Sequence, residues 1–486
     1  MKTLAYSGNF GSIKKLKLDN SEAVLGSMMT DRLSALPDEI LGYMLSFLTL
    51  RDSVRTRLLS ARWRYLSDYR CVLHFDALNV LGNENNNREL YQSKFVSVVD
   101  HYLEIWKGWN LSALKIHFCL HNKHALHIDK WVESGIRMEV EDLDLRFPST
   151  NPEERYVLSD QLFHSGKAFS FKCLRLRYCT LTFSSGCTSW ISCLATLELY
   201  FVPLCQEDIE CLMSGGLNLT SLSLVHCFNT DISSVIELPR LKKLFLNNTF
   251  TKIELKCPNL ESLKCEGRVD YFKFSNVPLL KNVNLRLQYH YRGCSLTFED
   301  LAIHAPKLQK LSLLVMTLVQ PRPANNSLCL KRLELLTDVP TGFDLFTITS
   351  LLNASPFLEI LHLQLRMRNY TKQSPHIEYS DCPHLNLKEV KIDGFRRWWN
   401  EMELARYLLK NAVALERMVI VCLCDCSSTI DGSVSSYCSS IREEIATTLL
   451  RDMKTSTELV FTTPIPCSVS NGWDISNYGV RVFCGE

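Results

Sequence analysis

Large apolar residues recur along this chain in the spacing L-x-x-L-x-L, in which Val, Ile, Phe, Met or Cys sometimes replaces Leu. Copies begin at Leu111, Val140, Phe171, Leu194, Leu219, Leu241, Leu260, Leu280, Leu308, Leu330, Leu358 and Leu387. Successive copies begin 19 to 31 residues apart. A single unit of this length cannot bury its apolar face, but stacked units bury a continuous one. The pattern therefore predicts a repeat solenoid of the α/β class, with a curved parallel sheet on one side and helical or irregular segments on the other.

The unit length and the pattern are typical of a leucine-rich repeat. In such a unit the fifth position faces the concave side of the sheet. These positions hold Lys115, Asp144, Arg175, Glu198, Ser223, Phe245, Lys264, Asn284, Ser312, Glu334, His362 and Lys391. Both signs of charge mix with polar and aromatic side chains, whereas a nucleic-acid groove would show a stripe of one sign. The row suits a protein partner, although solvated positions would look similar.

From this row we select six candidate contacts to a target protein. They are Arg175, Glu198, Phe245, Lys264, Glu334 and His362. No catalytic residue is assigned, because the sequence contains no Gly-rich phosphate loop, no G-x-S-x-G elbow and no H-E-x-x-H motif.

Cysteines and histidines raise the question of a metal site. Cys119, Cys179 and Cys227 occupy the ninth position of their units, where a thiol fills apolar space and donates to turn carbonyls. That interpretation is favoured over a redox or metal role. Four histidines gather near Cys119, namely His117, His121, His124 and His127. Metal ligation needs convergent ligands, and these residues fall at a predicted strand end and loop, so no metal and no cofactor is predicted.

A different pattern precedes the repeats, in the segment Asp31–Tyr69. Apolar residues at spacings of one, three and four from Leu36 to Leu48 predict a first helix, with Pro37 in its first position. Residues 49–52 read as a turn and 52–59 as a second helix. Ser60 is placed to cap a third helix over 61–67.

Three short helices in forty residues bury too little surface to fold well alone. Each has an apolar face, which is more than one small core can absorb. The segment is therefore interpreted as a docking module, completed by another protein or by the rest of the chain. An ordinary helical subdomain is the alternative.

The sequence of this segment resembles the plant F-box. The matching positions are Leu36, Pro37, Ile40, Leu41, Leu45, Ser46, Phe47, Leu48, Val54, Leu59, Ser60, Arg62, Trp63, Arg64 and Leu66. The resemblance implies docking on the Skp adaptor of a cullin-RING ubiquitin ligase. It also implies a set of adaptor-facing residues, which are Leu36, Pro37, Ile40, Leu41, Leu45, Val54, Leu58 and Trp63.

The residues on both sides of the repeats also show patterns that predict helices and strands. A strand is predicted over 72–77 and a helix over 90–107, and this helix is expected to pack the docking module against the repeats. Beyond residue 381 the pattern predicts a strand over 387–392, a turn at Gly394, a helix capped by Asn400 and a strand over 415–421. This region resembles the FBD domain of plant F-box and leucine-rich-repeat proteins. Its matching positions are Val390, Gly394, Phe395, Glu403, Leu404, Tyr407, Leu408, Leu409, Asn411, Ala412, Leu415, Met418 and Ser456–Phe461.

These signals predict six segments. They are a disordered tail (1–30), an F-box (31–70), a connecting strand and helix (71–110), leucine-rich repeats (111–380), an FBD domain (381–461) and a C-terminal extension (462–486). The net charge of +2 on 486 residues gives no reason to expect nucleic acid or an anionic membrane as a partner. Neither a signal peptide nor a membrane span is read in the sequence. A cytoplasmic or nuclear location, with mostly free thiols, is expected.

The resemblance implies a non-enzymatic adaptor. In this reading the F-box recruits the ligase, and the repeats with the FBD end hold an unknown substrate protein. Two alternatives remain: a leucine-rich scaffold without a degradative role, and a co-receptor for a small ligand.

Overall fold

The computed structural model describes most of the chain from residue 33 to residue 462. The described residues are 33, 35–48, 50–56, 58–66, 72–82, 88–105, 111–149, 151–164, 170–183, 188–227, 233–288, 298–315, 328–337, 345–365, 382–422, 444–449 and 457–462. The expected tail and, apart from Thr462, the expected C-terminal extension lie outside these residues.

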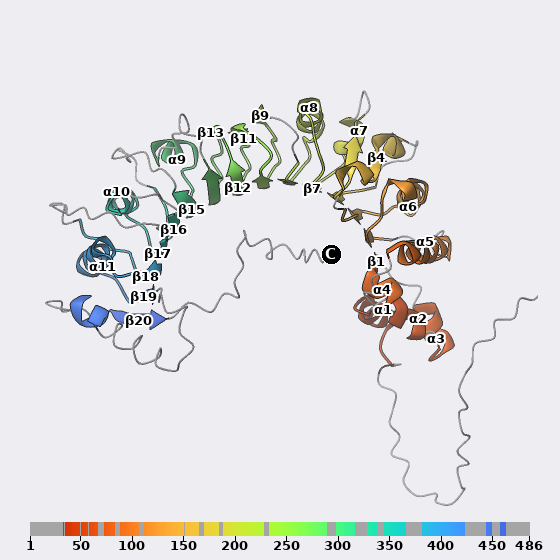
Figure 1. The fold of residues 1–486 in the computed structure, drawn as a ribbon, viewed down its shortest axis with the longest axis horizontal. Coiled ribbons are helices and arrows are strands. Elements are labelled where there is room, and N and C mark those ends of the chain that lie inside the picture. The colour runs from red at the N-terminus through yellow and green to blue at the C-terminus, as the bar shows by residue number, and fades with distance from the viewer. Residues whose placement is uncertain are drawn as a thin grey trace, which may run out of the picture.

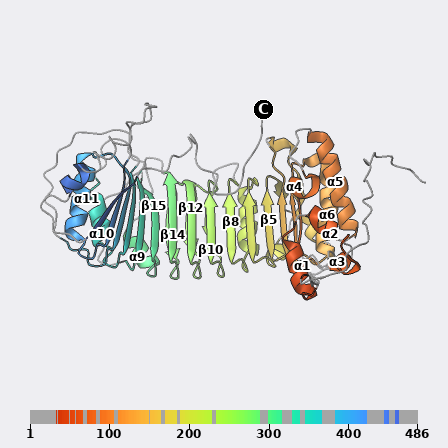
Figure 2. The ribbon, with the colours of Figure 1, turned by 90° about the horizontal axis from the view of Figure 1, so that it is seen from below.

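One parallel sheet of 15 strands runs through the described chain and lines the inner side of an arch (Figure 1). Figure 2 shows its strands side by side. In sheet order they are β1 (Val72–Asp76), β2 (Ala113–His117), β3 (Asp142–Arg146), β5 (Cys173–Arg177), β7 (Thr196–Tyr200), β8 (Ser221–Val225), β10 (Lys243–Asn247), β12 (Ser262–Arg268), β14 (Asn282–Gln288), β15 (Lys310–Val315), β16 (Arg332–Thr337), β17 (Ile360–Leu365), β18 (Glu389–Phe395), β19 (Arg417–Cys422) and β20 (Glu458–Thr462). The predicted α/β solenoid is confirmed.

The repeat pattern sets the register of this sheet. In the unit that begins at Leu219, the first, fourth and sixth positions, Leu219, Leu222 and Leu224, are at most 1% exposed. Leu222 lies opposite Leu197 on one side and Leu244 on the other, both at the same position of their own units. Equivalent leucines therefore stack from unit to unit and form one continuous core.

Helices cover most of the outer side of the arch. They are α5 (Arg88–Ile105), α6 (Ala125–Arg137), α7 (Thr188–Ile191), α8 (Gln206–Gly215), α9 (Phe298–His304), α10 (Thr347–Asn353) and α11 (Trp399–Asn411). Three short 3-10 helices, η1 (Asn122–His124), η2 (Pro152–Glu154) and η3 (Asp160–His164), and a small parallel pair of strands, β4 (Val157–Ser159) and β6 (Thr180–Thr182), lie among them.

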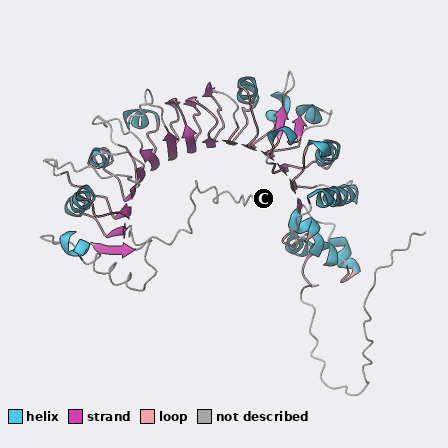
Figure 3. Cartoon of the chain, viewed as in Figure 1, coloured by secondary structure: helices cyan, strands magenta, loops and turns pink. Residues whose placement is uncertain are grey.

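The middle of the arch has strands instead of helices on its outer side (Figure 3). These are β9 (Ser233–Ile236), β11 (Lys252–Lys256) and β13 (Tyr271–Asn276), which form a second parallel sheet. They fall in the units that begin at Leu219, Leu241 and Leu260, which are among the shortest in the array. A strand rises about 3.3 Å per residue and a helix about 1.5 Å. A short unit therefore returns along the solenoid more readily as a strand.

A recurring backbone conformation marks the eighth position of several units, near the carboxyl end of the inner strand. The φ angle there is positive at Tyr178 (58°), Phe201 (54°), His226 (52°), Asn248 (45°), Gly267 (111°) and Gly394 (83°). The turn predicted at Gly394 is wrong, because Gly394 lies inside β18, where the pairing with β19 shifts register between Asp393 and Phe395. The backbone N–H of His226 donates to the Asn247 carbonyl of the next unit at 2.8 Å, so the eighth position also joins neighbouring repeats.

Two of the three ninth-position cysteines behave as expected. Cys179 and Cys227 are fully buried, and the Cys227 thiol donates to the Leu199 carbonyl at 3.1 Å. The expectation is wrong for Cys119, which is exposed; its carbonyl accepts a hydrogen bond from Gln92 Nε2 at 2.8 Å. Other cysteines in the described part of the chain are free thiols, whereas Cys211 is disulfide-bonded.

The N-terminal segment forms three helices, α1 (Asp38–Ser46), α2 (Leu50–Thr56) and α3 (Ala61–Leu66). Two predicted boundaries are wrong. Pro37 is the cap residue before α1 and not its first residue, and α2 already begins at Leu50, inside the predicted turn. The predicted cap of α3 is confirmed, since the Trp63 N–H donates to Ser60 Oγ at 3.3 Å.

The three helices join the solenoid at its first strand. Helix α2 contacts β1 and α4 (Ala77–Leu81), and α4 in turn contacts α5. The principal contacts of the module thus run through α4 and β1, while α5 packs beside α6. Because β1 pairs with β2 in register, the strand expected as a connector is part of the large sheet.

Near the other end, a buried carboxylate organises the start of α11. Asn400 was expected to cap this helix, but it lies inside the first turn. Glu401 takes the capping role instead: it is 1% exposed, and its Oε2 accepts the backbone N–H groups of Arg396 at 2.7 Å and Trp398 at 3.2 Å. Burial raises the pKa of Glu401 to about 7 against the opposing effect of these hydrogen bonds.

Replacing Glu401 with Gln should flatten the dependence of stability on pH. The folded protein holds the Glu401 proton more tightly than the unfolded chain, so its free energy of unfolding falls as pH rises from about 4.5 to 7. The pKa difference corresponds to about 3 kcal/mol. Urea unfolding at several pH values should show this fall in the wild type and in Asn400→Ala, which keeps the carboxylate, but not in Glu401→Gln. Equal slopes in all three proteins would contradict the argument.

Candidate interaction surfaces

The three N-terminal helices expose an unusual amount of apolar surface. The exposed fractions are 47% for Ile40, 65% for Tyr43, 40% for Met44, 72% for Phe47, 38% for Leu48, 88% for Leu58 and 68% for Leu59. The rings of Tyr43 and Phe47 meet edge to face, with centroids 4.8 Å apart. Exposed apolar side chains gathered on three short helices are typical of an interaction site.

The predicted adaptor-facing residues divide into an outer and an inner set. Pro37, Ile40 and Leu58 are exposed. Leu41 (0% exposed) and Leu45 (2%) form the small core of the segment. These two leucines therefore act from inside the module, by holding its helices in place.

Leu36 and Trp63 pack partly buried against that core. The side chain of Val54 lies outside the described residues. Tyr43 and Phe47 were not among the predicted contacts, although their spacing of four residues on one helix was a readable signal.

An arginine fixes the orientation of the first helix against the third. Arg62 on α3 donates to Asp38 Oδ1 through Nε at 2.9 Å and through Nη2 at 2.6 Å, and to the Leu36 carbonyl at 2.5 Å. The guanidinium group thus ties the residues before α1 and its first turn to α3, so the exposed apolar side chains of the module are held in one arrangement.

The fifth-position row is continuous across the inner sheet. Arg175 lies opposite Glu198, Phe245 opposite Lys264 and Glu334 opposite His362. The structure therefore brings the six candidate residues together as three neighbouring pairs. All six are partly exposed, which leaves them accessible from the inner side of the arch.

Ion pairs between neighbouring strands balance much of this row. Arg175 lies 2.5 Å from Asp142 and 3.3 Å from Glu198. The Lys264 ammonium sits 4.5 Å from the centre of the Phe245 ring and 3.1 Å from Glu266. Such a surface carries alternating charge and suits a partner of complementary pattern.

The other end of the row follows the same rule. Glu334 pairs with Lys310 at 3.1 Å and with Arg332 at 2.8 Å. His362 Nε2 lies 2.6 Å from Asp393 Oδ2. These contacts fix the side chains before any partner arrives, which lowers the entropy lost on binding.

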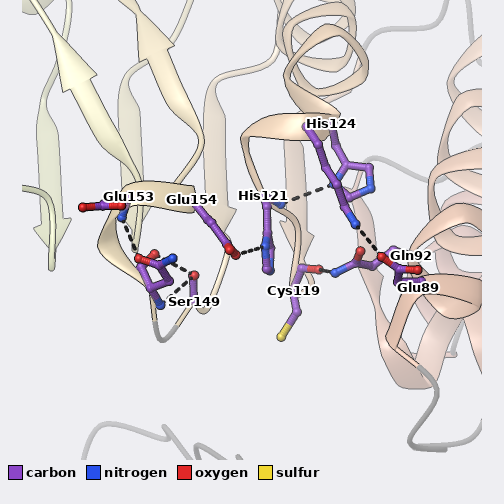
Figure 4. A network of polar contacts seen from close by, with 10 residues as sticks. Glu89, Gln92, Cys119, His121, His124, Ser149, Glu153 and Glu154 are labelled. Atoms are coloured by element: carbon purple, nitrogen blue, oxygen red, sulfur yellow. Dashed lines mark hydrogen bonds and ion pairs between the residues drawn. The ribbon is translucent and has the colours of Figure 1, made fainter.

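Of the clustered histidines, His121 and His127 pair with separate carboxylates. His121 Nδ1 contacts Glu154 Oε2 at 2.8 Å, and the His121 backbone N–H donates to His124 Nδ1 at 3.3 Å (Figure 4). His127 contacts Asp100 at 2.8 Å. Within the described ranges no group of three or more His, Cys, Asp or Glu is placed to hold a metal ion.

His117 belongs to a different chain of contacts on the inner sheet. Its Nδ1 lies 3.1 Å from His74 Nε2, and its Nε2 lies 3.1 Å from Asp144 Oδ2. Burial lowers the pKa of His74, and the neighbouring His117 lowers it further. These rings extend the polar row toward the N-terminal module.

No helix in the described part of the chain is both long and apolar enough to cross a membrane.

Comparison with known proteins agrees with this architecture. The leucine-rich-repeat domain of At1g61320/AtMIF1 matches residues 103–460. The F-box/FBD/LRR-repeat protein At5g56420 of Arabidopsis thaliana is 27% identical over 410 residues, covering 80% of this chain and 91% of that protein. The putative FBD-associated F-box protein At1g61330 of the same plant is 24% identical over 421 residues, covering 79% and 89%. The chain belongs to the plant family of F-box/FBD/leucine-rich-repeat proteins.

Proposed function

We propose that this protein is the substrate-recognition subunit of an SCF-type ubiquitin ligase in the cytoplasm or nucleus. Residues 31–70 would be the F-box that binds a Skp-family adaptor, and through it the cullin and RING subunits. The repeats at 111–380 and an FBD domain at 381–461 would hold the target protein. The observation that carries this proposal is the exposed apolar face of α1–α3, in a family whose members are named for their F-box.

The physical basis is apolar docking. Burying exposed side chains such as Ile40, Phe47 and Leu58 is favourable by about 25 cal/mol per Å² of apolar surface. The internal core of the segment, Leu41 with Leu45, is too small to offer that gain within the chain. An adaptor surface would supply the missing partner.

The proposed role requires no chemistry from this chain. A bound target lies close to the ubiquitin-loaded enzyme, and proximity converts an encounter between two molecules into a reaction within one complex. The ion-paired row on the inner sheet, from Arg175 to His362, would choose the target through its pattern of charge.

The adaptor-binding proposal is tested with the double variant Ile40→Asp and Leu58→Asp. Both side chains are exposed, at 47% and 88%, so the variant should fold normally. Two charges in an apolar interface should weaken capture of a purified Skp-family adaptor at least tenfold. Leu126→Asp, at a position 76% exposed on α6, is the matched control and should bind like the wild type. Unchanged binding by the double variant would refute the assignment of this face.

A further inference from the structure

Three arginines lie near the carboxyl ends of the inner strands, outside the fifth-position row. Arg146 ends β3, Arg177 ends β5, and the two lie opposite each other in the sheet. Arg155 directly follows η2, whose Glu154 is labelled in Figure 4. Positive charges on neighbouring strands repel each other unless a negatively charged group lies between them.

The protein supplies hydrogen-bond partners for only part of each guanidinium group. The Nε atoms of Arg146, Arg155 and Arg177 are each buried without a hydrogen-bond partner in the described part of the chain. Arg177 lies 3.8 Å from Glu198, but that carboxylate is closer to Arg175. Neither Arg146 nor Arg155 forms an ion pair within the described residues. Desolvating a charge without a partner is costly, so these groups are suited to an anion from outside.

A ladder of stacked rings begins at Tyr178, directly after Arg177. Tyr178 stacks on Phe201 and Phe201 on His226, with centroids 4.7 Å apart in both pairs. That distance matches the spacing of about 4.8 Å between neighbouring strands, because the three rings occupy the eighth position of consecutive units. The ladder is therefore as rigid as the sheet that carries it.

Neighbouring residues hold two of the arginines in place. Arg155 Nη1 donates to the Phe201 carbonyl at 3.0 Å, and the Arg177 guanidinium sits 4.7 Å from the centre of the Tyr200 ring. All three arginines lower the pKa of the Tyr178 hydroxyl, although burial, the larger effect, raises it.

We propose that Arg146, Arg155 and Arg177, beside the ring ladder, form a binding site for a phosphate dianion carried by the target protein. Two guanidinium groups without an ion pair match the two charges of a phosphate monoester, and the forked donors of arginine match its oxygens. The inference rests on the proposed function in one respect only, the assignment of the phosphate to a bound protein.

The first experiment measures anion binding to the full chain by calorimetry at pH 8 and constant ionic strength. Inorganic phosphate should bind, and acetate should bind at least tenfold more weakly. Arg146→Gln and Arg155→Gln should each weaken phosphate binding at least tenfold. Arg332→Gln removes a guanidinium already paired with Glu334 and should bind phosphate like the wild type. Equal affinity for acetate, or unchanged binding in both cluster variants, would overturn the site.

A second arm tests the source of the phosphate. The peptide Gly-Gly-phosphoserine-Gly-Gly should bind more tightly than glycerol phosphate, while the same peptide without phosphate should not bind. Equal affinities for the peptide and glycerol phosphate would overturn the assignment to a protein ligand. Arg146→Lys and Arg155→Lys keep the positive charge but lack the forked donors of a guanidinium group. The folded variants should therefore bind phosphate with intermediate affinity. None of these measurements involves the adaptor, so failure of this site and failure of adaptor binding are distinguishable.

Discussion

Replacing Leu41 with Ala should unfold the three N-terminal helices and leave the solenoid intact. Leu41 is fully buried, and its core is shared with Leu45 and separate from the continuous core of the repeats. Removing a buried leucine side chain costs about 2–5 kcal/mol. A segment of about forty residues has roughly that much stability in total. The variant should therefore lose most adaptor binding without any change in an adaptor-facing side chain.

Hydrogen exchange resolved by segment is the measurement that separates the two units. In Leu41→Ala, amides of α1 and α3 should exchange much faster, while those of β8 and β10 keep their wild-type protection. Leu58→Ala is the control, because Leu58 is 88% exposed and its truncation should leave exchange in α1 unchanged. Loss of protection throughout the sheet of Leu41→Ala would mean that the module and the solenoid fold as one unit.

The repeat register could be predicted because it depends on short-range information. Each unit repeats the same spacing of leucines, and each strand contacts only its neighbours, so the first apolar position of a unit fixes the fourth, fifth and sixth. Phe245 and Lys264, separated by 19 positions in the sequence, fall opposite each other for this reason.

The outer side of the arch was less predictable. The spacing of apolar residues does not decide whether the chain of a short unit returns to the next inner strand as a helix or as a strand. The strand β11 replaces a helix where the unit is short. Glu401 replaces Asn400 as the helix cap because a longer side chain can reach back to two backbone N–H groups. Cys119 is exposed although it occupies the same position in its unit as the buried Cys227.

The arginine cluster was missed for a different reason. Arg146 and Arg177 stand at the seventh position of their units, whereas the repeat pattern predicts the interaction surface at the fifth position. Arg155 comes from an irregular segment whose path no periodicity fixes. The positive φ angles of Tyr178 and Phe201 are set by the turn between units, and the sequence alone gives no sign that a large aromatic side chain would accept them.

Replacing Gly394 with Ala should strongly destabilise the C-terminal repeats. Gly394 has a φ of 83°, and the pairing of β18 with β19 shifts register between Asp393 and Phe395. A Cβ atom here would lie 2.2 Å from the Leu365 carbonyl oxygen of the preceding strand. The left-handed conformation alone costs about 1–2 kcal/mol for an L-residue. Moving a backbone carbonyl out of the way should bring the loss to about 3 kcal/mol or more.

Arg397→Gly separates the two contributions to that loss. Arg397 also has a positive φ, of 65°, and its replacement by Gly relieves the backbone while making the unfolded chain more flexible, so its stability should stay within about 1 kcal/mol of the wild type. Urea unfolding of Gly394→Ala, Arg397→Gly and the wild type provides the comparison. A loss of only about 1 kcal/mol in Gly394→Ala would show that backbone conformation is the whole effect and that the contact with Leu365 is not tight. The larger loss would establish that β17 and β18 approach so closely at Gly394 that only glycine fits between them.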